Sequence, residues 1–151
     1  MKATTQELKV TARMQPGIIT LSGFLGDDTR PLNEIVADDA ATLARLERSA
    51  EEIAQRMQYF TDESWNTYLG GVLLDDKYQV ETEVYRGKLP CPYVHPGVFR
   101  KAITRLTNSA NGISVAWTAL SIHLIAEHGF FEGRGSAFRL DPEILVKALW
   151  D

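Results

Sequence analysis

The sequence predicts a single compact α+β domain over residues 1–151, with a largely antiparallel sheet built from hairpins and about four helices. Segments in which apolar and polar residues alternate are typical of half-buried strands, and they occur between segments with helical apolar spacing. These strands and helices follow no regular βαβ repeat, so a parallel sheet is not expected. A length of 151 residues suits one domain with its own core.

The first predicted element is a β-hairpin over residues 7–24. Apolar and polar side chains alternate in residues 8–14, as expected of a strand with one buried face. Pro16-Gly17 marks the turn, and residues 18–21 form the expected return strand. A loop rich in glycine and aspartate then leads to the first helix.

The clearest predicted element is a helix from about Asp39 to Phe60. Its apolar residues are spaced alternately three and four apart, which aligns them along one face. This stripe fits either a coiled-coil contact with a second subunit or packing on the chain's own sheet. The second interpretation is favoured, because the stripe is shorter than the usual coiled-coil pattern. It comprises Leu43, Leu46, Ala50, Ile53, Met57 and Phe60.

The middle of the chain is expected to contain a short helix over 61–70, a hairpin over 72–86 and an irregular loop over 90–97. Three prolines in the loop remove backbone donors and hold the preceding residues extended. Apolar spacing then predicts a helix over 98–106, and β-favouring residues predict a buried strand over 113–117. The 61–70 helix carries Trp65, Tyr68 and Leu69.

The last third of the chain has clear helix boundaries. Thr118 is a suitable N-cap for a helix that ends at His128, before a glycine. That helix is apolar nearly all round, which predicts a central position. Residues 130–138 are expected to form two short strands around a glycine turn. Asp141 followed by Pro142 marks the start of the last helix.

Composition narrows the functional classes. The net charge is −4, which disfavours nucleic-acid binding without a local basic patch. The single cysteine excludes an intrachain disulfide and favours a reducing compartment. No secretory signal and no membrane span is expected, so the predicted location is cytoplasmic, with no membrane partner. The common nucleotide-binding, zinc-protease and hydrolase motifs are absent from the sequence.

One group of residues is suited to metal binding or catalysis. The only cysteine and all three histidines lie in two short segments, as Cys91 and His95 in the proline loop and His123 and His128 on the apolar helix. His123 and Glu127 are four residues apart and share a helix face, as two ligands of one metal ion would. His128 lies about 140° round the helix from His123. These five residues are the candidate metal ligands, and thiolate with imidazole suits zinc.

The sequence leaves several functions open. It favours a cytoplasmic binding or interaction domain that forms a homo-oligomer, with each histidine and the cysteine in an ordinary structural place. The alternative is a small zinc-dependent or cysteine-based enzyme, for which Cys91, His95 and His123 are the candidate catalytic residues. A third hypothesis, phosphate or nucleic-acid binding, would use the basic residues Arg100, Lys101, Arg105 and Arg134.

Overall fold

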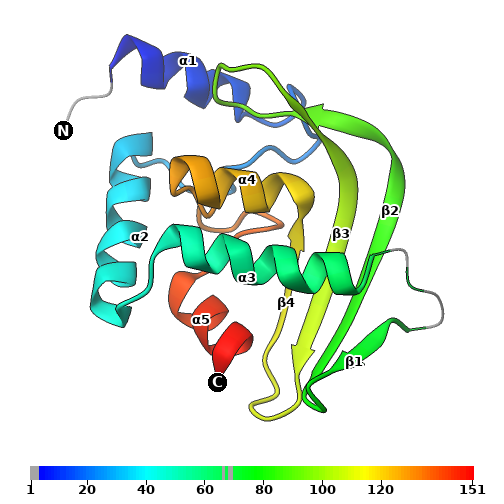
Figure 1. Cartoon of the computed structure of the whole chain (residues 1–151). Coiled ribbons are helices and arrows are strands. Elements are labelled where there is room, and N and C mark those ends of the chain that lie inside the picture. The colour runs from blue at the N-terminus through cyan, green and yellow to red at the C-terminus, as the bar shows by residue number, and fades with distance from the viewer. Residues whose placement is uncertain (1–3, 66, 68–69) are drawn as a thin grey trace.

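A computed structural model describes residues 4–65, 67 and 70–151. In this part of the chain, five helices accompany one antiparallel sheet with the strand order β1-β2-β3-β4, which confirms the predicted α+β class (Figure 1). The helices are α1 (Thr5–Arg13), α2 (Leu32–Leu46), α3 (Ala50–Glu63), α4 (Ala119–His128) and α5 (Pro142–Trp150). The strands are β1 (Val72–Leu74), β2 (Tyr78–Pro90), β3 (Val98–Asn108) and β4 (Ser114–Thr118).

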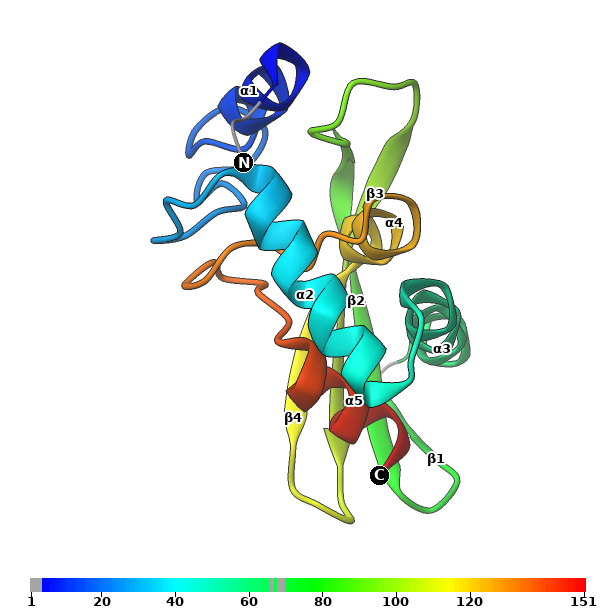
Figure 2. The same cartoon turned by 90° about the vertical axis from the view of Figure 1, so that its left-hand side faces the viewer.

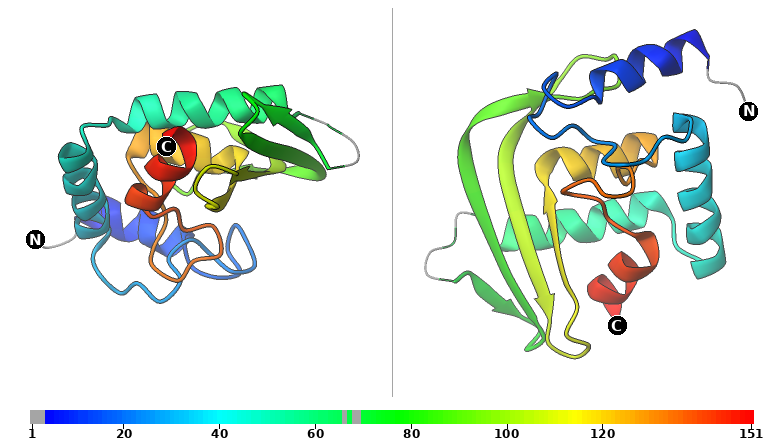
Figure 3. Two further views of the ribbon diagram at one scale, coloured as in Figure 1. Left: turned by 90° about the horizontal axis from the view of Figure 1, so that it is seen from below. Right: turned by 180° about the vertical axis from the view of Figure 1, so that it is seen from behind.

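The long strands β2 and β3 curve around the helices. Helices α3, α4 and α5 lie on one face of the sheet, and α2 crosses their far ends (Figures 1 and 2). The view from below and the view from behind show no helix of the described residues on the opposite face (Figure 3). Within the described ranges, no helix combines the length and apolarity that a membrane crossing requires.

The apolar core has two parts, between which α4 lies. The sheet-side cluster joins α3, α5 and the sheet, and includes Ile53, Phe60, Trp117, Ile125 and Leu145. The loop-side cluster joins α1, α2 and the loop after β2, and includes Val10, Met14, Ile35, Cys91 and Leu124. Helix α4 contributes to both clusters, which explains why its sequence is apolar nearly all round.

A chain of buried hydroxyl groups connects α3 to the sheet. It begins at the Trp117 indole N–H, which donates to Thr61 Oγ1 at 2.9 Å. Hydroxyl contacts continue through Thr104 and Thr82 to Ser64, at 2.9, 2.8 and 2.7 Å, and Ser64 donates to the Phe60 carbonyl at 2.7 Å. The indole N–H at one end can only donate, and the carbonyl at the other end can only accept. All hydrogen bonds of the chain therefore run in one direction, from Trp117 to Phe60, and each hydroxyl accepts one bond and donates one.

Thr104→Val is expected to interrupt this chain. Valine keeps the shape and the β-propensity of threonine but leaves the hydroxyls of Thr61 and Thr82 each without one partner in a buried site. We expect the free energy of unfolding to fall by about 1–3 kcal/mol in urea denaturation. Thr107→Val is the matched control in the same strand: the Thr107 hydroxyl contacts Ser114 at an exposed position, where water replaces the lost partner, so the effect should be close to zero.

The N-terminal hairpin prediction is wrong, because residues 5–13 form α1 and residues 18–21 form turns and bends. The Thr4 hydroxyl caps α1 by accepting from the backbone N–H of Glu7 at 3.1 Å. Val10 and Met14, four residues apart, are buried, whereas Leu8 is 59% exposed. The alternation in this segment was therefore compatible with a helix in which Leu8 faces solvent.

The predicted helix over 39–60 is two helices, with its start seven residues earlier than expected, at Leu32. Glu47 adopts a left-handed conformation at φ 56°, which ends α2. Ser49 then starts α3 through a capping box with Glu52. Within the short 61–70 segment, Thr61–Glu63 belong to α3, and the predicted helical residues Tyr68 and Leu69 lie outside the described part of the chain.

The predicted helix over 98–106 is wrong, because this segment is β3, paired with β2 and β4. Its buried residues are Ala102, Thr104, Leu106 and Asn108, at strand spacing. Two of these are polar, so the alternation is not visible from hydrophobicity alone. Residues 130–138 form turns and irregular structure instead of two strands.

The other predicted elements are confirmed. Strands β1 and β2 form the hairpin expected over 72–86, although β2 extends further, to Pro90. The proline loop has no helix or strand between Cys91 and Gly97. Strand β4 and helices α4 and α5 begin at or within one residue of their predicted starts, with Thr118 and Asp141 as the N-caps. Strand β4 is an edge strand in which Trp117 alone is buried, so the expected burial of this segment is wrong.

Candidate metal centre

Two segments separated in the sequence bring the cysteine and the three histidines together. Cys91 and His95 lie on the loop between β2 and β3, and His123 and His128 lie on α4, the second at its C-terminal end. This loop lies next to both α4 and α1 at one end of the molecule (Figure 1). One potential ligand atom from each of the four residues lies within 4.8 Å of all the others.

The individual distances are short. His95 Nε2 lies 3.0 Å from His123 Nε2 and 3.2 Å from His128 Nε2, and Cys91 Sγ lies 3.6 Å from His128 Nε2. Cys91 is buried, with 1% of its surface exposed, and the histidines are half-buried. Three ring nitrogens and one sulfur therefore surround a common point at the protein surface.

Hydrogen bonding alone does not account for this convergence. His95 Nδ1 lies 2.8 Å from the Pro96 carbonyl, which can only accept, so in a neutral ring Nδ1 carries the proton and Nε2 has a lone pair. That single lone pair faces two imidazole nitrogens, and it can accept only one well-directed hydrogen bond. A cation at the common point would instead use every lone pair, with the Pro96 carbonyl fixing the His95 tautomer.

Surrounding residues hold the four side chains in place. The ring of Tyr93 stacks on His128 at a centroid distance of 3.8 Å and an angle of 3°, and Phe99 stacks on His123 at 4.3 Å. Arg13 of α1 donates to the carbonyls of Pro92 and Cys91, each at 2.8 Å. The loop is thus fixed from both sides, by aromatic contacts towards α4 and by hydrogen bonds to α1.

The electrostatic environment favours neutral imidazoles. Burial lowers the pKa of His123, and the neighbouring His95 lowers it further. Burial, followed by His123 and His95, lowers the pKa of His128 to about 4. Burial raises the pKa of the Cys91 thiol, so without a cation the thiol keeps its proton.

The structure places four of the five candidate ligands in one group and leaves the fifth outside it. Glu127 is exposed and is not a member of the group, although it shares a helix face with His123. His123 and His128 come together despite their angular separation, with ring centroids 5.2 Å apart. Both rings approach His95 through Nε2, the nitrogen farther from the backbone, and so reach it from two sides of the helix. Tyr93, Phe99 and Arg13, which support the group, carried no recognisable sequence signal.

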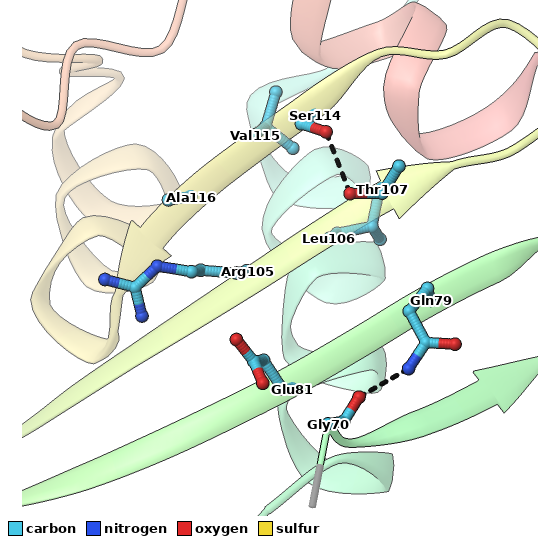
Figure 4. A pocket seen from close by; sticks show the side chains of 9 residues that line it. All are labelled: Gly70, Gln79, Glu81, Arg105, Leu106, Thr107, Ser114, Val115 and Ala116. Carbon is cyan, nitrogen blue, oxygen red and sulfur yellow. Dashed lines mark hydrogen bonds between the residues drawn. The ribbon is translucent and has the colours of Figure 1, made fainter.

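A second candidate, a groove of about 470 Å³, lies on the helix-free face of the sheet (Figure 4). Its polar groups are partly paired with the protein: Gln79 donates to the Gly70 carbonyl, and the hydroxyls of Thr107 and Ser114 are 2.8 Å apart. Arg105 forms a salt bridge with Glu83 at 3.7 Å. Among the described residues that line this groove, no comparable set of ligand atoms converges.

Comparisons with protein-family models, with curated proteins and with solved structures gave no significant match to this chain. The geometry of the group itself is therefore the basis for a functional proposal.

Proposed function

We propose that the protein is a zinc-binding domain in which Cys91, His95, His123 and His128 hold one zinc ion. The observation that carries this proposal is the approach of four potential ligand atoms to within 4.8 Å of one another. In a tetrahedral site with zinc–nitrogen distances of about 2.0–2.1 Å and a zinc–sulfur distance of about 2.3 Å, neighbouring ligand atoms are about 3.3–3.6 Å apart. Three of the six separations between ligand atoms, at 3.0, 3.2 and 3.6 Å, are close to these values, and all six are at most 4.8 Å.

The number of ligands supports a structural role for the ion. Four protein ligands complete a tetrahedral shell, whereas catalytic zinc sites keep one position for water or substrate. The ligands also come from two segments that the ion would join, the β2–β3 loop and α4. Self-association and a cytoplasmic location stay predictions, and the proposed ion requires neither.

The cysteine-based enzyme is less well supported by the geometry. A nucleophilic cysteine needs a lowered thiol pKa and access to substrate. Cys91 has only 1% of its surface exposed, and burial raises its pKa. A zinc ion would stabilise the thiolate as a ligand instead of leaving it free to react.

The proposal predicts close to one zinc ion per chain after purification without chelator and extensive dialysis, measured by elemental analysis. Cys91→Ser and His123→Ala should each lose most of the zinc, because each removes a ligand. Glu127→Gln is the matched control on the same helix and should keep the full amount. A metal-free wild-type chain that does not take up added zinc would overturn the proposal, and zinc loss in Glu127→Gln would overturn the ligand set.

A further inference from the structure

Two adjoining cavities lie between the β2–β3 hairpin, the start of α4 and the segment before α5, and the loop over residues 20–24 also lines the smaller one. The outer cavity has a volume of about 510 Å³ and the inner one about 180 Å³. Leu89, Thr118, Leu120 and Phe138 line both, so the two cavities share a wall that is largely apolar. A mostly apolar cavity with a few polar groups is typical of sites for small organic molecules.

The rim of the outer cavity is basic. The pairing of β2 with β3 shifts register between Val84 and Lys88, so that Tyr85, Arg86 and Gly87 stand opposite Lys101 alone. Such bulges redirect side chains, and Arg86 lines the outer cavity together with Lys101 and Arg100. None of the three basic residues forms a salt bridge with a described residue. In a chain with a net charge of −4, a cavity lined by three basic residues that form no salt bridge with a described residue favours an anion.

The inner cavity contains a polar group. Glu132 lines it with 6% of its surface exposed, and its carboxyl accepts a hydrogen bond from Ser136 Oγ at 2.6 Å. Burial raises the pKa of this carboxyl to about 7, and the Ser136 hydrogen bond and the charge of Arg139 act in the opposite direction. A hydroxyl group of a ligand would donate a second hydrogen bond to this carboxyl, in addition to that from Ser136.

We infer that the two cavities form one binding site for a small amphipathic anion. Its carboxylate or phosphate group lies at the basic rim, its apolar body lies against Leu89, Leu120 and Phe138, and a hydroxyl group at its far end reaches Glu132. The site uses none of the four proposed zinc ligands, so this inference and the zinc proposal can fail separately.

Titration calorimetry with decanoate, decanol and decyltrimethylammonium tests the charge preference. Decanoate should bind, and the neutral and cationic analogues should bind at least about tenfold more weakly, because only the carboxylate pairs with the rim. Arg100→Gln/Lys101→Gln should weaken decanoate binding by a similar factor. Lys9→Gln/Lys88→Gln, which removes two exposed charges outside both cavities, should leave it unchanged. Equal binding of the three probes, or no binding of decanoate, would overturn the inference.

Two further measurements test the inner cavity and the source of the ligand. ω-Hydroxydecanoate should bind more tightly than decanoate, and Ala137→Trp, at an exposed position that lines the inner cavity, should remove this advantage. An equal affinity for both acids would exclude the role of Glu132.

Protein that binds phosphatidylglycerol vesicles but not monomeric decanoate would show a membrane surface contact and would overturn the small-molecule site. Zinc content, measured on the same samples, reports separately on the metal centre.

Discussion

Chelation of the proposed zinc ion is expected to lower the free energy of unfolding by about 4 kcal/mol relative to protein in free zinc at about a thousandfold excess over the dissociation constant. The ion would bind the folded chain far better than the unfolded one, because the β2–β3 loop and α4 bring its ligands together only on folding. His123→Ala should lower stability to a similar degree and should no longer respond to chelator. Urea denaturation followed by circular dichroism measures both effects.

The control for this experiment is again Glu127→Gln, which should keep both the stability and the chelator response of the wild type. If the wild type unfolds at the same urea concentration with and without chelator while it holds one zinc ion per chain, the ion has no structural role. The inference that four protein ligands make this a structural zinc site would then be wrong, even though the protein binds the metal.

Ile53→Glu is expected to unfold the domain. Ile53 lies on α3 with 0% of its surface exposed, inside the sheet-side cluster. The substitution removes an apolar side chain and places a carboxylate without a partner in the core, at a cost of at least about 4 kcal/mol. That loss is comparable to the whole stability of a small domain, about 5–15 kcal/mol. Circular dichroism and light scattering check the result.

Ile144→Glu is the matched control, since Ile144 lies in the first turn of α5 and is 50% exposed. This variant should remain folded, and a carboxylate near a helix N-terminus is favourable. A folded, monomeric Ile53→Glu variant would contradict the core position of α3 and would revive the subunit-contact interpretation of the apolar stripe.

The elements that sequence reasoning predicted well have strong local signals. Asp141 followed by Pro142 specifies a helix start, and Thr118 with the glycine after His128 delimits α4. Strand β3 was mispredicted because its conformation depends on pairing with β2 and β4, which local spacing does not report. The capping box of Ser49 and Glu52 was visible in the sequence and would have divided the long helix correctly.

The types of residue in the candidate metal centre, cysteine and histidine, were predictable from the sequence. The exact set of ligands was only partly predictable, because Glu127 was included among the candidates. Cysteine and histidine are scarce in this chain, so their occurrence in two segments was informative. The i,i+4 rule selected Glu127 beside His123, yet it says nothing about the direction from which a distant loop approaches. The loop carrying Cys91 and His95 approaches α4 where His128, and not Glu127, can reach it.

The division of the core into two clusters has a consequence for partial unfolding. Domains open locally in cooperative units whose free energies range from near zero to that of global unfolding. The loop-side cluster holds α1, the first part of α2 and the β2–β3 loop, whereas the sheet-side cluster holds α3, α5 and Leu43 of α2 against the strands. Opening of the first would release α1 and the Arg13 contacts while β4, α3 and α5 keep their packing. The proposed zinc ion would therefore stabilise the loop-side unit against local unfolding. Helix α4, which contributes to both clusters, would lie at the boundary between the two units.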